Sequence, residues 1–174
     1  MDMEHRFSPV ESVSGRKLAG YAAVFGHEAR IASFVEVIRA GAFSDTLKGR
    51  DILALVDHKP DAVLARTKSG TLRLHEDERG LAFELDLPDT QAGRDVLELA
   101  KRGDLGGMSF GFTVGKGGEV WQGERRELVR VNLHEISVVS AWPAYEGTSV
   151  QARRKTPQRL AHALRYLETC TWDF

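Results

Sequence analysis

The stretch Gly103–Thr113, which reads GDLGGMSFGFT, constrains the fold most strongly. As a strand it would turn Met108, Phe110 and Phe112 toward a core and Ser109 to the opposite side, because successive side chains alternate. The glycines beside Ser109 leave room for another backbone to approach its hydroxyl closely. This layout suits a nucleophile, and it equally suits a tight bend in a small barrel.

Short alternating segments around this stretch favour a β fold. Frequent turns, with 17 glycines against 5 prolines, are typical of closed or strongly bent sheets. One clear helix is predicted between Thr90 and Gly103. Thr90 suits its N-cap, Lys101 and Arg102 suit its last turn, and Gly103 suits the position just beyond its end. The other expected elements are a loop at 27–30, a short helix at 41–47, a charged turn at 123–126, and strands at 18–25, 31–38, 51–58, 71–75, 81–87, 119–122 and 128–140. The predicted class is mainly β with flanking helices.

A length of 174 residues supports one domain with a hydrophobic core and is short for two. We predict a domain over residues 1–150 and a tail over residues 151–174 with a basic linker and an amphipathic helix.

The 24 Lys and Arg residues nearly balance the 25 Asp and Glu residues, which argues against nucleic acid or a membrane as partner. A single cysteine, Cys170, excludes an internal disulfide framework. No apolar run has the length of a membrane span or a secretory signal, so we expect a cytosolic protein, or one enclosed in an assembly formed there.

Two more candidate site residues lie at predicted strand positions. His58 ends an apolar run of strand length, which places its imidazole at the rim of a sheet. Alternation puts Glu135 on the face of Leu133 and Ser137, with His134 on the opposite face. A carboxylate in so apolar a strand is costly to bury unless it is paired. A surface histidine and a carboxylate on a wet face are the alternative interpretations.

Ser109, His58 and either Glu135 or His134 supply the groups of a serine acyl-transfer site. The serine needs a base within hydrogen-bond reach, and the base needs a third group that orients its ring and stabilises its charged form. The residue types fit this chemistry. Whether they meet depends on the fold.

Six segments, in order, resemble the prohead maturation protease family of tailed bacteriophages. They span roughly residues 18 to 150, and an ordered set is more specific than any one segment. The segments are GYAAVF from Gly20, EVIRAGAF from Glu36, LVDH ending at His58, LARTKSGTLRL from Leu64, GDLGGMSFGF from Gly103 and LHEISVVSAWPA from Leu133.

The resemblance implies a serine endopeptidase with a fold similar to the herpesvirus assemblin proteases, a closed small β-barrel flanked by helices. Matched position by position, His58 corresponds to the general base and Ser109 to the nucleophile. The family's Leu-x-Glu-x-Ser pattern points to Glu135 as the third member, whereas the second histidine of the herpesvirus enzymes makes His134 its rival. We favour Glu135 because a carboxylate holds the correct tautomer and offsets imidazolium charge more strongly. No cofactor and no metal ion is implied.

The resemblance also implies where such an enzyme acts. Proteases of this kind are built into the immature capsid, cut the major capsid protein or its scaffold, and process themselves. We therefore expect capsid or scaffold substrates, action inside the prohead in the host cytoplasm, and a homo-oligomer as an open alternative to the monomer. Arg153–Lys155 marks an exposed place for self-cleavage, and residues 140–145 are the expected source of oxyanion donors.

Two other classes stay open. A catalytically silent capsid assembly or scaffolding component could have the same fold. A metallohydrolase using His58, His75 and His134 is the weaker alternative, because these residues lack the short helical spacing typical of zinc sites.

Overall fold

The computed structural model describes residues 3–8 and 10–140, which form thirteen strands and two helices. Neither helix has the length and apolar composition that a membrane crossing requires. The predicted tail, with Arg153–Lys155 and Cys170, lies outside the described residues, as do residues 141–145. The strands are β1 Glu4–Ser8, β2 Val10–Ser14, β3 Lys17–Val24, β4 Glu28–Ile31, β5 Phe34–Ile38, β6 Leu53–Val56, β7 Lys59–Arg66, β8 Leu72–Glu76, β9 Gly80–Asp86, β10 Gly107–Thr113, β11 Glu119–Gln122, β12 Arg125–Leu128 and β13 Asn132–Val139, and the helices are α1 Ser44–Leu47 and α2 Gln91–Arg102.

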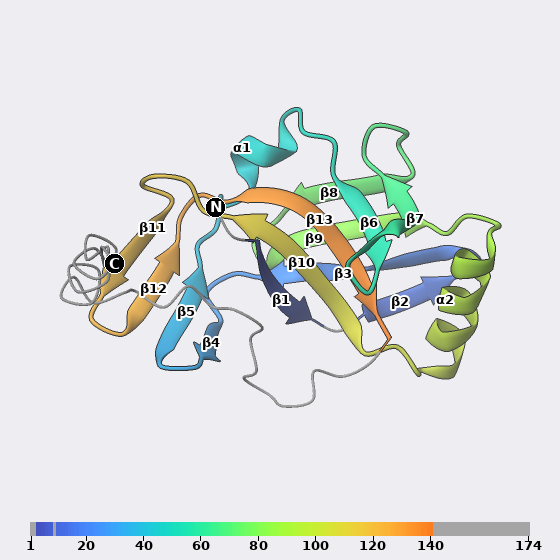
Figure 1. Ribbon diagram of the computed structural model, residues 1–174, viewed down its shortest axis with the longest axis horizontal. Helices are drawn as coiled ribbons and strands as arrows, with labels where there is room; N and C mark the ends of the chain where they lie inside the picture. Colours follow the sequence, from blue (N-terminus) through green and yellow to red (C-terminus); the bar gives the residue numbers. More distant parts are fainter. Residues whose placement is uncertain (1–2, 9, 141–174) are drawn as a thin grey trace, which may run out of the picture.

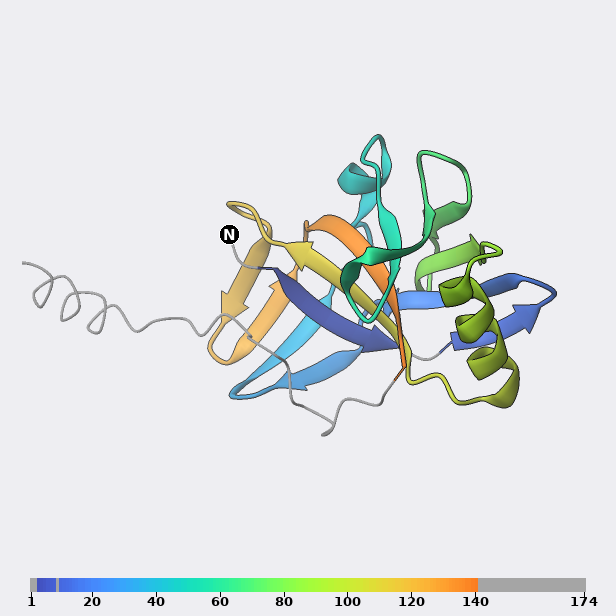
Figure 2. The same ribbon diagram turned by 45° about the vertical axis from the view of Figure 1, so that its right-hand side comes forward.

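The strands form three sheets. A five-stranded sheet has the order β1-β10-β13-β6-β7, and two four-stranded sheets have the orders β11-β12-β5-β4 and β2-β3-β9-β8. The long strands β10 and β13 cross the middle of the molecule, with the β11-β12-β5-β4 sheet toward one end and α2 at the other (Figure 1). The turned view keeps β1 beside β10 (Figure 2).

The predicted class, mainly β with few helices, is confirmed. The predicted closed barrel is not found among the described residues, whose hydrogen-bonded ladders form three open sheets. The five-stranded sheet, for example, ends in β1 on one side and β7 on the other. The barrel therefore stays a prediction.

Strand β10 has the core-facing side that its sequence predicted. Met108, Phe110 and Phe112 are almost completely buried. The ring of Phe110 stacks near that of Phe112, with centroids 5.2 Å apart, and meets Phe43 edge-on at 5.6 Å. The opposite side of β10 is buried as well, since Ser109 has no exposed surface. Strand β10 is thus central to the fold on both of its faces.

The helix predicted before β10 is confirmed as α2. The hydroxyl of Thr90 accepts a hydrogen bond from the backbone N–H of Gly93, and Gly103 ends the helix with a φ of 74°. Glycine adopts this left-handed conformation without a Cβ clash, which explains the stop. The chain then enters β10 four residues later.

Two interpretations of strand pattern were wrong. The interval 27–30, predicted as a loop, contains most of β4, and β4 and β5 form a hairpin about Ala32, whose φ is 50°. The segment 128–140 is not one strand but the end of β12 and all of β13. The break follows from pairing: β12 adds in parallel to β5, and Val129 and Arg130 then both donate to the carbonyl of Gly118.

Strand β13 also departs from simple alternation, because of a bulge. Gly111 pairs with Glu135, but the next residue, Phe112, pairs with Leu133, so His134 is the extra residue in β13. Such a bulge re-aims the side chains that follow it. Leu133 therefore joins the core side of Phe112 rather than the side of Glu135, which corrects the predicted face.

Candidate active site

Ser109 lies at the centre of the five-stranded sheet, and its neighbours follow from the register. Ser109 pairs with Ser137 across the β10–β13 ladder, and Gly111 pairs with Glu135. Directly paired residues project to the same side of an antiparallel ladder, so all four share one side. The hydroxyl of Ser109 is buried and has no hydrogen-bond partner among the described residues. An unpaired buried hydroxyl costs about 1–3 kcal/mol, so it needs an explanation, and catalysis is one.

His58 lies in the two-residue turn between β6 and β7, next to this side of the sheet. Both Asp57 and His58 have positive φ, 48° and 58°, as a type I′ hairpin turn requires. Neither is glycine, and such residues cost about 1–3 kcal/mol each, a strain that concentrates at functional sites. The turn is tied to β13: the carboxylate of Asp57 accepts hydrogen bonds from the backbone N–H and the hydroxyl of Ser140. The backbone N–H of His58 donates to the hydroxyl of Ser137 at 3.2 Å.

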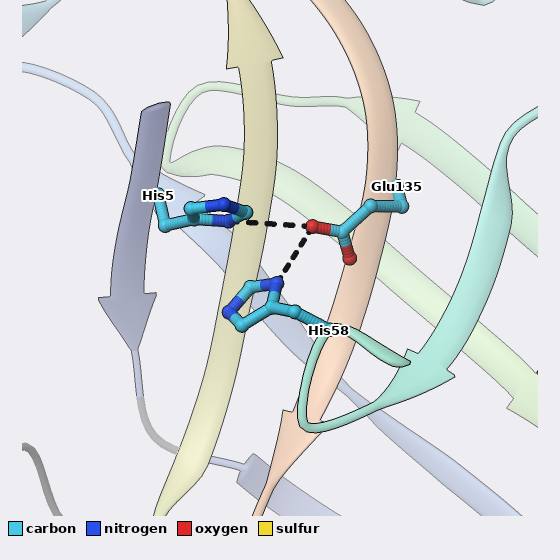
Figure 3. A group of neighbouring side chains, drawn as sticks. All are labelled: His5, His58 and Glu135. Carbon is cyan, nitrogen blue, oxygen red and sulfur yellow. Dashed lines mark hydrogen bonds and ion pairs between the residues drawn. The ribbon is translucent and has the colours of Figure 1, made fainter. Parts of the chain in front are cut away.

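The side chains of His58 and Glu135 meet above β10. Nδ1 of His58 lies 2.8 Å from Oε1 of Glu135. Figure 3 shows the two side chains converging from the β6–β7 turn and from β13, while the β10 ribbon runs between β1 and β13. The side chain of Glu135 is 9% exposed and that of His58 is 24% exposed, so this is a mostly desolvated charge-assisted pair.

Glu135 is ionised despite its burial. Burial raises the pKa of this carboxyl, but its contacts with His5, His58 and Ser137 outweigh burial and lower the pKa to about 2. The hydroxyl of Ser137 donates to Oε2 of Glu135 at 2.6 Å. Ser137 thus holds the carboxylate through one oxygen and His58 through the other. The carboxylate is fixed in place and carries a full negative charge near neutral pH.

His5 is the site residue that the sequence did not reveal. Its Nδ1 lies 3.4 Å from the same Oε1 of Glu135, an ionic contact rather than a short hydrogen bond, and its ring centroid is 4.0 Å from that of His58. Figure 3 shows His5 reaching this position from β1. The entry segment 1–13 has no clear periodicity, and only the pairing of His5 with Gly111 across the sheet brings it to the site.

Strand β1 is held in register by charges on its other side. Glu4 and Arg6, which flank His5, both belong to a buried ion cluster with Arg126 at its centre. Arg126 has no exposed surface, and it donates to Glu4 at 2.8 Å and to Glu36 at 2.9 Å. Burial opposes the charge of Arg126, but these carboxylates raise its pKa above the ordinary value. Because side chains alternate, this cluster fixes β1 while leaving His5 on the side of Glu135.

A comparison with protein-family models decides the class of protein. Residues 4–162 match the model of the caudovirus prohead serine proteases. The chain belongs to this family. No curated protein and no solved structure matches it. Family membership implies a serine peptidase of capsid maturation, which agrees with the resemblance seen in the six ordered segments.

Within this prohead protease fold, His134 lies apart from the pair of His58 and Glu135. Its Nε2 is 2.9 Å from the hydroxyl of Thr113, and its Nδ1 is 3.0 Å from a guanidinium nitrogen of Arg50. Burial and the charge of Arg50 lower the pKa of His134. Both ring nitrogens are therefore engaged with groups outside the site.

The trio that a metallohydrolase would have needed is not brought together. Among the described residues, the single group of three or more potential ligands near one another is His5, His58 and Glu135. His75 lies on β8, in a different sheet from β13, which carries His134, and from β6 and β7, whose connecting turn carries His58. The zinc-hydrolase interpretation with His58, His75 and His134 is thus wrong.

Proposed function

We propose that this chain is a serine endopeptidase in which Ser109 is the nucleophile, His58 the general base and Glu135 the group that orients His58. Its substrates would be the major capsid protein or the scaffold, and itself, inside the prohead in the host cytoplasm. The observation that carries the proposal is the 2.8 Å contact between Nδ1 of His58 and the buried, ionised Glu135. This contact lies on the side of the sheet that also carries the hydroxyl of Ser109, which has no hydrogen-bond partner within residues 3–8 and 10–140.

The chemistry follows from the state of the imidazole. With Glu135 ionised, Nδ1 of His58 carries the proton and donates it in the hydrogen bond, so Nε2 is the basic nitrogen. Nε2 takes the proton of Ser109 as the serine oxygen attacks the peptide carbonyl. The imidazolium then gives that proton to the leaving amine, and a water molecule hydrolyses the acyl-enzyme by the same path in reverse. Glu135 stabilises the positive charge that His58 carries between these steps.

Rigid positioning supports this proposal. Ser137 links Glu135 to the backbone of His58, because its hydroxyl donates to one and accepts from the other. His5 contacts the Glu135 oxygen that accepts from His58. We assign both residues a positioning role, since neither needs to touch the substrate. The closed small barrel of the assemblin type remains part of the proposal, and an experimental structure of the full chain would test it.

The decisive experiment replaces Ser109 with alanine. Purified Ser109→Ala is incubated with the major capsid protein from the same phage, and the fragments are mapped by mass spectrometry. We expect cleavage to fall at least about 10³-fold, because the nucleophile is lost. The fold should persist, since the hydroxyl of Ser109 makes no hydrogen bond to the part of the chain that the structure describes.

Ser69→Ala, in an exposed turn, is the matched control and should cleave normally. Undiminished cleavage by Ser109→Ala would overturn the proposal. A wild-type chain that binds the capsid protein without cutting it would support the assembly component instead.

A further inference from the structure

We propose that His5, His58 and Glu135 also form a binding site for a divalent transition-metal ion of zinc-like chemistry, and that an ion bound there holds the protease inactive. The binding part stands on the geometry of the three side chains alone. The inhibitory part rests on the function proposed above. The ion is thus an inhibitor of the reaction, not a cofactor for it.

The three ligand atoms are already close enough to share an ion. Nδ1 of His58 and Nδ1 of His5 lie 2.8 Å and 3.4 Å from Oε1 of Glu135. One potential ligand atom from each of the three residues lies within 4.8 Å of the other two. Zinc binds nitrogen and oxygen at about 2.0–2.2 Å, which places tetrahedral ligands about 3.3–3.6 Å apart. Movements of a few tenths of an ångström to about 1 Å would therefore suffice. Two histidines and one glutamate also make up a known zinc ligand set with a fourth position open.

The surroundings of these residues suit a metal site. The Glu135 carboxylate is buried and accepts a hydrogen bond from Ser137 on its second oxygen, the kind of outer contact that orients a metal-binding carboxylate. His5 is placed by β1, which the Arg126 cluster anchors, and His58 by a turn tied to Ser140. Each ligand thus comes from a fixed backbone. The two imidazole side chains remain about one quarter exposed, although Nδ1 of His5 itself is buried. An ion would therefore enter past the exposed ring edges.

Metal binding and catalysis require opposite states of His58. Coordination needs the lone pair of Nδ1, so the Nδ1–H···Glu135 hydrogen bond breaks and a bond from Nδ1 to the metal forms. As the metal binds, Nδ1 gives up its proton to solvent and Nε2 takes one from solvent. The ring stays neutral, with its single proton on Nε2. Nε2–H donates and cannot accept the proton of Ser109. The ion therefore removes the general base without occupying the position of the nucleophile.

Binding is tested in a chain that cannot cleave itself. The parent variant carries Ser109→Ala and also Cys170→Ser, because a thiol would bind zinc by itself. Zn²⁺ is titrated calorimetrically, and Co²⁺ is titrated by its visible absorption, which reports tetrahedral coordination. We expect one ion per chain, and His5→Gln should weaken its binding at least about 10-fold because one of three ligands is lost.

His75→Gln is the matched control, since His75 is an exposed histidine on β8 and should leave the affinity unchanged. Circular dichroism checks that each variant is folded, and Glu135→Gln provides a second ligand deletion. Absence of a bound ion in the parent, or an equal affinity in His5→Gln, would overturn the site.

Inhibition is then measured in the chain with Ser109 restored and Cys170→Ser retained. Zn²⁺ should lower cleavage of the capsid protein, a chelator should restore it, and His5→Gln should need at least about 10-fold more Zn²⁺ for the same inhibition. If the chain binds one ion but shows no protease activity under any condition, the proposed function is overturned and the metal site is retained. An active enzyme that binds no ion would overturn the metal site and leave the proposed function standing.

Discussion

The two sides of strand β1 carry two buried charged clusters of opposite character. On one side, Glu4 and Arg6 join Arg126 and Glu36 in a network of guanidinium and carboxylate groups. On the other side, His5 meets a single carboxylate, Glu135, that His58 also contacts. Consecutive residues of one strand therefore belong to different clusters. The two clusters nevertheless differ in whether their side chains are of a type that can transfer a proton.

The ion cluster is built from groups with permanent charges. Burial raises the pKa of Glu4, but the hydrogen bonds and charges of Arg126 and Arg6 outweigh it and leave the pKa lowered. Arginine does not release its proton near neutral pH. The cluster therefore fixes geometry and exchanges no protons.

The site pairs its carboxylate with two imidazoles, side chains of the type that most often transfer protons in enzymes, beside a serine hydroxyl that has no hydrogen-bond partner among the described residues. The pKa of Glu135 is lowered like that of Glu4, but the partners of Glu135 include two imidazoles instead of two guanidinium groups. The contrast fits an ion cluster that supplies stability and register, and a Glu135 site that supplies the chemistry of the proposed reaction. Changes to the site should thus alter activity, and changes to the cluster should alter folding.

Among the changes that test this contrast, Glu135→Gln is expected to have the largest effect, a loss of activity. An amide has no charge to offset the imidazolium and can favour the wrong tautomer of His58, so kcat should fall about 10²–10⁴-fold. Tm should change far less than activity. Glu127→Gln is the control, because Glu127 is another buried carboxylate, paired with Arg39 rather than with a histidine. Activity of Glu135→Gln within tenfold of wild type would remove Glu135 from the mechanism.

Arg126→Met should produce the converse result. Removing the central guanidinium leaves Glu4 and Glu36 buried with too little positive charge, which should lower the free energy of unfolding by about 3–5 kcal/mol. Denaturant unfolding measures this. Arg125→Met, on the same strand but partly exposed, should cost at most about 1 kcal/mol. Similar losses for the two variants would show that the cluster does not stabilise the fold.

Gly111→Ala should damage the site through geometry. A Cβ on Gly111 would clash with Oε1 of Glu135 and lie 3.2 Å from Cε1 of His5. The carboxylate must then move away from His58, and a shift of about 1 Å can cost roughly 10²-fold in rate. Steady-state kinetics check this. Gly115→Ala, where a Cβ meets only an amide nitrogen at 3.8 Å, should stay near wild type, and equal rates for both variants would contradict the close packing.

The smallest effect is expected from His134→Gln. His134 neighbours Glu135 in sequence but contacts Thr113 and Arg50 instead of the site. Loss of these contacts should cost about 1 kcal/mol of stability at most, and kcat/KM should stay within about twofold. A larger loss of activity than in Glu135→Gln would return the role of third residue to His134.

The sequence predicted most of the local elements and the three residues of the proposed triad. Ser109 was found from its glycine neighbours, His58 from its place at the end of an apolar run, and Glu135 as a carboxylate in an apolar strand. The family resemblance then implied that these three residues belong to one catalytic site. The choice of Glu135 over His134 rested on charge chemistry, and the contacts of Glu135 with His58 support it. The assignment of roles remains a prediction that the variants above test.

Pattern alone did not find the features that depend on pairing. The bulge at His134 and the division of the segment 128–140 arise from register with β10 and β5, which lie far away in sequence. The positive φ of Asp57 and His58 is held by bonds to β13. Two non-glycine residues give no turn signal of the usual kind. Local propensity cannot report contacts that only a long-range ladder creates.

The sequence by itself determined the three residues of the proposed triad, because residue type sets which side chains can act as nucleophile, base or charged partner. The tertiary structure alone decided that His5 joins them. A short N-terminal strand with no clear periodicity becomes part of the site only when its two flanking charges are buried against Arg126 and its register with β10 is set. The physical reason is that ion pairing and strand register act between segments more than one hundred residues apart, as Arg126 and Glu4 show.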